Sequence, residues 1–230
     1  MKNSKLRRAL LLVASAVLLV CVSVGATLAY LTDDTEAVVN TFTVGSVSFD
    51  DGTPTTESAL GLDEAEVDPY GENPTTSRTK ENEYKINPGH NYIKDPTAHI
   101  GSDSEDAWLF VKVTNNLGDL EVAADYAIVE GENGLSAQSP LTGTIKEQMI
   151  KLGWVCIDET NGIYAYTKVV SKNDDIVVFK AFKISGTEEM PTEDAVENLS
   201  VTITAYLIQA DGFEGATGYQ NAWTTAGSEF

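Results

Sequence analysis

Apolar and polar residues alternate in several short stretches of this chain, and a spacing of two is typical of β-strands. In residues 107–114 one alternate set is apolar throughout, and the other begins aromatic and ends polar. This pattern predicts a strand that is buried on both faces at its start. Further strands are predicted at residues 38–49, 84–86, 97–100, 126–129, 154–157, 163–166, 176–184 and 201–210.

Turn and helix signals separate these stretches. Asn161-Gly162 stands between two apolar runs and predicts a hairpin. Residues 145–152 carry apolar side chains four and three apart before a glycine, which predicts a short amphipathic helix, and residues 219–223 suit one further helical turn. The fold class expected is therefore all-β, a jelly-roll-like β-sandwich with one or two short helices.

The first 29 residues follow a different pattern. A basic start at residues 2–8 leads into an apolar run at 10–24, which is how a signal peptide begins. Thr27 and Ala29 are the small residues expected before a cleavage site, so the mature chain would start at Tyr30. The run of about 15 residues is shorter than the ~20 that span a membrane, although an uncleaved anchor stays open.

We therefore expect a signal helix at 1–29 and a secreted domain at 30–230, with membrane contact only through the uncleaved signal. Residues 50–83 are rich in Asp, Glu, Thr, Gly and Pro and contain few large apolar residues. We expect them to form an acidic surface insertion or a flexible segment that buries little.

Charge and residue content restrict the chemistry. The formal charge of −20 repels nucleic acid, so no nucleic acid partner is expected. The chain has two histidines, His90 and His99, with no His-Glu-x-x-His or Gly-x-Ser-x-Gly motif. We expect no catalytic residue, no metal ligand and no cofactor, with calcium on acidic clusters as a weak alternative. Cys156, the one cysteine left after cleavage, is expected to be a core residue.

Residues 25–33, Gly-Ala-Thr-Leu-Ala-Tyr-Leu-Thr-Asp, and 39–45, Val-Asn-Thr-Phe-Thr-Val-Gly, resemble the N-terminus of the TasA and camelysin family. Leu31 departs from the phenylalanine that the family usually has there. The resemblance implies export through a SipW-type signal peptidase in a Gram-positive bacterium. It also implies a jelly-roll-like protein of the biofilm matrix or cell surface, which forms fibres with itself or a related matrix protein.

In such fibres the N-terminal strand of one subunit completes the sheet of the next. The phase of the apolar pattern in residues 38–49 changes at a glycine, which predicts a bulge or two short strands. By position, the candidate donor strand contains Asn40, Phe42, Val44, Gly45, Val47 and Phe49. The same residues also suit an ordinary first strand of their own domain.

We expect a non-enzymatic structural protein. Two alternatives remain, namely a camelysin-like surface metalloprotease and a monomeric adhesin that binds through residues 50–83.

Overall fold

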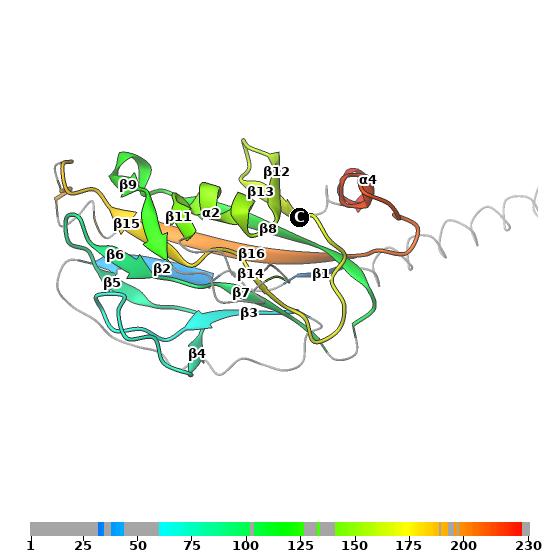
Figure 1. Cartoon of the computed structure of the whole chain (residues 1–230), viewed down its shortest axis with the longest axis horizontal. Coiled ribbons are helices and arrows are strands. Elements are labelled where there is room, and N and C mark those ends of the chain that lie inside the picture. The colour runs from blue at the N-terminus through cyan, green and yellow to red at the C-terminus, as the bar shows by residue number, and fades with distance from the viewer. Residues whose placement is uncertain are drawn as a thin grey trace, which may run out of the picture. The chain divides into compact units, whose positions relative to one another are not determined.

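The computed structural model separates residues 1–32 from a second unit, 33–230. The residues it describes are 32–34, 38–43, 60–101, 104–126, 133, 141–188, 190–192, 196 and 198–226. The predicted signal peptide, which contains Thr27 and Ala29, lies outside them, and so does the predicted mature start at Tyr30. The described residues form mostly short β-strands in several antiparallel sheets, with two α-helices (Figure 1). The prediction of a mainly β fold is therefore confirmed.

The largest sheet has seven strands. Six of them follow the order β12 (Trp154–Asp158), β13 (Ile163–Tyr166), β8 (Ala107–Asn115), β16 (Ser200–Gln209), β2 (Val38–Thr43) and β5 (Glu83–Lys85). β1 (Thr32–Asp34) also pairs with β16. The β8–β16 ladder is antiparallel and runs along the whole of β8, from Ala107 to Asn115. β2 pairs antiparallel with β16 and parallel with β5, so it joins two segments distant in sequence.

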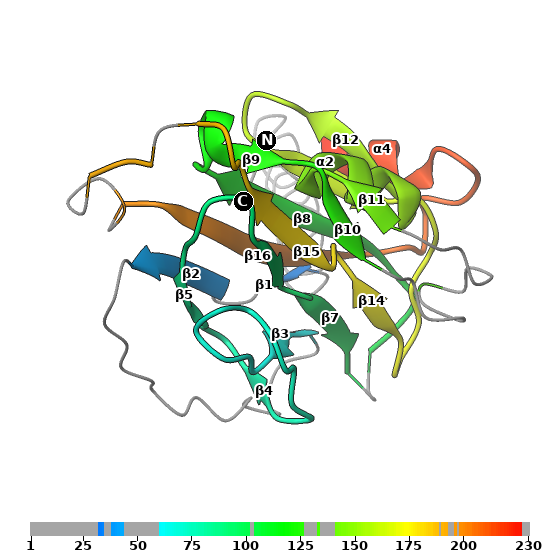
Figure 2. The same ribbon diagram turned by 60° about the vertical axis from the view of Figure 1, so that its left-hand side comes forward.

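The other sheets are smaller (Figure 2). One has the order β14 (Asp175–Val177), β7 (Thr97–Ile100), β3 (Leu60–Ala65) and β4 (Arg78–Thr79). Another has the order β6 (Asn91–Ile93), β15 (Ala181–Ile184) and β9 (Glu121–Val122), and β10 (Ala124–Tyr126) pairs with β11 (Leu141–Gly143). The remaining elements are η1 (Gly118–Leu120), α2 (Ile145–Lys151) and α4 (Gly218–Ala226).

β8 is buried on both faces at its start, as predicted. Its first five residues are buried, and exposed positions begin at Lys112. Leu109 and Val111 belong to the main core, whereas Trp108 and Phe110 belong to a second apolar cluster with Ala222 of α4. The aromatic half of the outward face is therefore buried because α4 covers it.

The predicted helix and hairpin are confirmed. α2 begins after Thr144, which forms a capping box with Glu147. β12 and β13 form an antiparallel hairpin with Gly162 in its turn at a φ of +69°. A Cβ atom on Gly162 would lie 2.3 Å from the carbonyl oxygen of Val113, so only glycine fits there.

Two sequence predictions are wrong. Residues 176–184 do not form one strand, because the chain leaves the sheet of β14 and joins the sheet of β15 across residues 178–180. The side chain of Gln148 accepts hydrogen bonds from the backbone nitrogens of Lys180 and Ala181 at this crossing. The side-chain amide of Gln148 thus replaces strand-ladder partners where the chain changes sheets.

The stretch 50–83 was expected to bury little, and this is wrong for residues 62–67. β3 lies inside its sheet, and Leu62 and Val67 are part of the core. Asp63 and Glu64 are also buried, because basic side chains pair with them. Composition misled the prediction, since it counts every acidic residue as solvated.

Two further predictions meet the structure in part. β10 begins two residues before the strand predicted at 126–129, and residues 127–129 are outside the described part of the chain. Cys156 is half-buried and packs against the main core as a free thiol.

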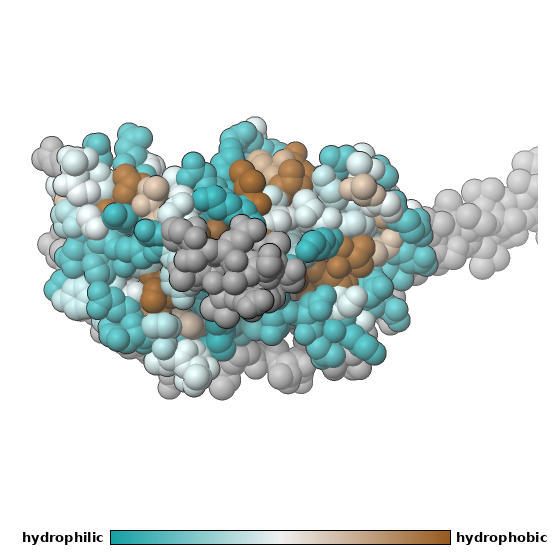
Figure 3. Space-filling view, viewed as in Figure 1, coloured by the Kyte–Doolittle hydropathy of each residue, from teal (hydrophilic) through white to brown (hydrophobic). Residues whose placement is uncertain are grey.

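Over the described residues, no helix combines the length and apolar character needed to cross a membrane. The face in Figure 3 is mostly hydrophilic, with separate hydrophobic patches.

Candidate functional site

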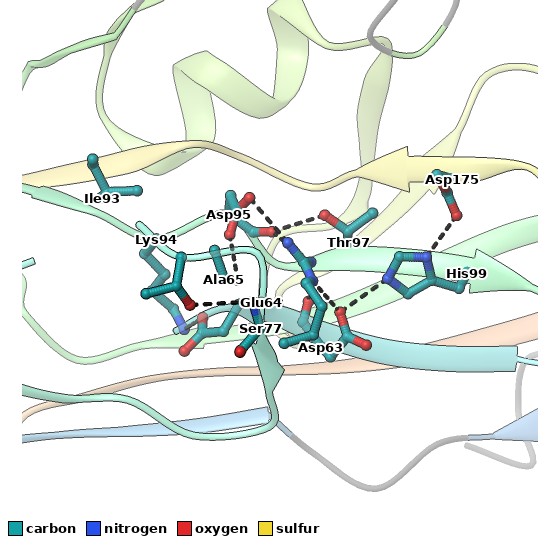
Figure 4. A network of polar contacts seen from close by, with 12 residues as sticks. Asp63, Glu64, Ala65, Ser77, Ile93, Lys94, Asp95, Thr97, His99 and Asp175 are labelled. Atoms are coloured by element: carbon teal, nitrogen blue, oxygen red, sulfur yellow. Dashed lines mark hydrogen bonds and ion pairs between the residues drawn. The ribbon is translucent and has the colours of Figure 1, made fainter. Parts of the chain in front are cut away.

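β3 carries two consecutive acidic residues, Asp63 and Glu64, and both are buried. Consecutive side chains of a strand point to opposite faces of its sheet, so the two carboxyl groups reach different neighbours. Figure 4 shows His99 between Asp63 and Asp175, and Lys94 beside Glu64. The two groups of contacts form the candidate site.

The first group, the ion-pair cluster, consists of Asp63, Arg78, Asp95, His99 and Asp175. Arg78 places Nε 2.6 Å from Oδ1 of Asp63 and Nη1 3.2 Å from Oδ2 of Asp95. His99 places Nε2 2.9 Å from Oδ1 of Asp63 and Nδ1 2.6 Å from Oδ1 of Asp175. The cluster therefore connects all four strands of the β14–β7–β3–β4 sheet.

Mutual attraction sets the charges of this cluster. The hydrogen bond to Asp63, followed by that to Asp175, raises the pKa of His99 above its ordinary value. Burial opposes ionisation of Asp63, but hydrogen bonds from His99 and Arg78 outweigh burial and lower the pKa of Asp63. Because both ring nitrogens of His99 face carboxylates, the doubly protonated ring, whose two N–H groups both donate, is the form that links the strands.

The second group, the amine cluster, consists of Glu64, Lys94 and Asn82. Nζ of Lys94 lies 2.6 Å from Oε2 of Glu64, and both side chains are 0% exposed. Nδ2 of Asn82 donates to Oε1 of Glu64 at 2.7 Å and to the carbonyl oxygen of Ala65 at 2.9 Å. The backbone nitrogen of Val67 donates to Oδ1 of Asn82 at 3.2 Å.

Burial dominates the electrostatics of the amine cluster. It raises the pKa of Glu64 and lowers the pKa of Lys94, although each group's attraction for the other opposes the shift. Burial, and then the charge of Glu64, also raises the pKa of the adjacent Tyr84 well above its ordinary value. The environment thus favours the neutral forms of both the acid and the amine.

The folding of the chain explains how these residues meet. Glu64 shares a strand face with Leu62 of the core, Asn82 directly precedes β5, and Lys94 directly follows β6. The backbone nitrogen of Lys94 donates to the carbonyl oxygen of Lys180, which fixes the chain where its side chain enters the core. Three separate segments of the chain therefore bring an amine, an amide and an acid together.

The two histidines considered from the sequence lie in different settings. Nε2 of His90 is 2.8 Å from the carbonyl oxygen of Tyr70, and His99 belongs to the ion-pair cluster. Within the described ranges, no group of three or more His, Cys, Asp or Glu residues is placed to hold a metal ion.

The candidate donor strand is described only in part. Asn40 and Phe42 lie in β2, where their backbones oppose Val201 of β16 and Tyr84 of β5. The other four residues, Val44, Gly45, Val47 and Phe49, lie outside the described residues.

The sequence prediction included no member of the amine cluster. One signal was available in the sequence. Leu62 and Glu64 are two residues apart, so they point to the same face of a strand, and an acid therefore stands where the alternation calls for an apolar residue. With 35 acidic residues in the chain, this single position did not stand out.

Comparisons of the chain with family models, curated proteins and solved structures found no match.

Proposed function

We propose that this chain is a secreted structural protein, a subunit of a biofilm matrix or surface fibre. In this proposal a SipW-type peptidase releases it before Tyr30, and it assembles with itself or a related matrix protein by strand exchange. The N-terminal resemblance at residues 25–45 supports the export route. The mainly β fold agrees with the jelly-roll-like sandwich that the proposal includes.

The observation that carries the proposal is the place of β2. It pairs with β16 from Val38 to Thr41 and with β5 from Thr41 to Thr43. If β2 left, both neighbours would expose unpaired backbone groups, and an equivalent strand from another subunit would satisfy them. A head-to-tail contact of this kind that does not close on itself produces a filament.

Charge would control when such assembly occurs. The chain has a formal charge of −20, and removing residues 1–29 takes away four basic residues and no acidic one, so mature subunits at −24 repel one another. Lower pH neutralises carboxylates and higher protein concentration favours association, so both should promote fibres.

Electron microscopy of the full chain, secreted from a host that contains a SipW-type peptidase, tests the proposal. Concentrating the protein or lowering the pH should produce fibres, and Asn40→Pro should prevent them because Asn40 opposes Val201 in a hydrogen-bonded pair of the β2–β16 ladder and proline removes its backbone donor. Asn40→Thr keeps that donor and is the matched control. Monomers under every condition, with and without a related matrix protein, would contradict assembly, and unchanged fibres from Asn40→Pro would contradict strand exchange.

A further inference from the structure

The amine cluster contains the parts of a reaction that the proposed function does not use. We propose that Lys94 and Asn82 become joined by an intramolecular isopeptide bond, with Glu64 as the acid–base group. This inference holds whether or not the chain forms fibres, because it depends only on residues inside one folded chain.

The position of Glu64 is the first reason. Its two carboxyl oxygens bind the two reacting partners separately, Nζ of Lys94 at 2.6 Å and Nδ2 of Asn82 at 2.7 Å. Lys94 and Asn82 are each 1% exposed and Glu64 is 0% exposed. An amine and a carboxamide held on one carboxyl group, away from solvent, gain the advantage of proximity over the same groups in water.

The protonation states are the second reason. Only the neutral amine of Lys94 is a nucleophile, and only the protonated acid of Glu64 can give a proton to a departing nitrogen. Moving one proton from Nζ to the carboxylate converts the ion pair into this reactive pair without changing the net charge. Burial favours this transfer, since it disfavours both charged forms.

The orientation of the amide is the third reason. The carbonyl oxygen of Ala65 accepts a hydrogen bond from Nδ2 of Asn82, so the amide nitrogen faces Glu64. The backbone nitrogen of Val67 donates to Oδ1, the atom on which negative charge develops when the carbonyl carbon is attacked. Asn82 is therefore held with its leaving nitrogen at the acid and its oxygen at a donor.

The reaction balances without another reagent. Nζ of Lys94 attacks Cγ of Asn82, and the Nζ–Cγ bond forms. Glu64 takes one proton from Nζ and supplies one to Nδ2, the Cγ–Nδ2 bond breaks, and ammonia leaves. Amine and carboxamide become a secondary amide and ammonia, with nothing oxidised or reduced and Glu64 restored.

The product would also relieve an energetic problem. Keeping an ion pair in an apolar core carries a desolvation penalty for each of the two ions. A neutral amide removes the charge of Lys94 and leaves Glu64 free to stay protonated. The bond would tie the segment before β5 to the segment after β6, across the residues between Asn82 and Lys94.

Peptide mapping of the purified full chain by trypsin and mass spectrometry tests the bond. Trypsin should fail to cut after Lys94, and residues 81–85 should appear joined to residues 86–112. The mass of the joined peptide should be the sum of the two peptides less one ammonia. Free peptides 81–85 and 86–94 at their sequence masses would overturn the proposal, and this outcome does not depend on any variant folding.

Three variants identify the participants. Glu64→Gln keeps the shape of the side chain but cannot exchange a proton as a carboxyl group does, so we expect the free peptides. Asn82→Asp should give the joined peptide with loss of water in place of ammonia. Lys180→Arg changes another buried lysine and should leave the join intact.

Two results would reject the mechanism even if ammonia were lost. A ring closure of Asn82 on its own backbone also releases ammonia, but it leaves peptide 81–85 separate and Lys94 open to trypsin. An equal yield of joined peptide from Glu64→Gln would show that Glu64 is not the acid–base group.

Discussion

Asp63 and Glu64 are neighbours on β3, yet the pKa values of their carboxyl groups are shifted in opposite directions. Asp63 meets two cations, Arg78 and His99, and its pKa is lowered. Glu64 meets one cation deep in the core, and its pKa is raised because burial outweighs the attraction of Lys94. The comparison shows that the number of partners and the access of solvent, rather than residue type, decide whether a buried acid stays charged.

The largest expected effect comes from breaking the buried pair. Lys94→Ala removes the cation beside Glu64 and leaves a buried acid, so the free energy of unfolding should fall by about 3–5 kcal/mol. Urea denaturation of the full chain measures this change. The double variant Glu64→Gln with Lys94→Met removes both charges and keeps the hydrogen bond from Asn82 to residue 64, so it should recover the part of the loss that comes from leaving Glu64 without its cation. A change below about 1 kcal/mol for Lys94→Ala would mean that the pair is not buried as described.

A smaller effect is expected on the other side of β3. Asp63→Asn removes the charge shared by Arg78 and His99, and hydrogen bonds to charged groups contribute about 1.5–3 kcal/mol each. We expect a loss of about 2 kcal/mol, because Asp95 and Asp175 still bind the two cations. The exposed Asp119→Asn serves as the control in the same urea series. A loss as large as that of Lys94→Ala would remove the contrast between the two clusters.

The pH dependence of stability separates the clusters further. The folded pKa of His99 is raised above its ordinary value of 6.5, so its contribution is fully present below that pH and is lost as pH rises through the folded pKa. The folded pKa of Asp63 is lowered below 3.8, so its contribution is present above that pH and is lost as pH falls through the folded pKa. Urea denaturation from neutral to alkaline pH should show a decline that His99→Gln lacks. Parallel curves for the two proteins would contradict the ionic role of His99.

The smallest effect is expected at Asp175, whose side chain is 68% exposed. Asp175→Asn should lower the free energy of unfolding by less than about 1 kcal/mol, as is usual for exposed pairs. It should also lower the pKa of His99, while the hydrogen bond to Asp63 keeps that pKa above its ordinary value. An NMR titration of the His99 ring checks both statements. A His99 pKa that does not change would show that Asp63 alone determines it.

Much of the fold could be predicted from local patterns. The alternation in residues 107–114 predicted both the strand and the burial of its two faces at its start. In the structure, the face that begins aromatic is buried because α4 covers it. The Asn161-Gly162 turn and the spacing in residues 145–152 likewise led to the observed hairpin and helix. These features depend on neighbours in sequence, which a single sequence contains.

The rest depends on contacts between distant segments. Nothing near residue 178 shows that the chain changes sheets there, since the crossing is held by Gln148 from α2. The amine cluster was missed for the same reason, because Glu64, Asn82 and Lys94 come from three separate segments. The burial of β3 was missed as well. A stretch rich in acidic residues is expected to be exposed to solvent unless the basic side chains that pair with it are known.

We infer that β3 holds a charged cluster on one side and, on the other, a cluster that loses its charge by forming a bond. A high-resolution crystal structure of the full chain would distinguish the two clusters. We expect continuous density between Nζ of Lys94 and Cγ of Asn82, with His99 still lying between the separate carboxylates of Asp63 and Asp175. Separate density for Lys94 and for an intact Asn82 amide in every molecule would show that the bond does not form.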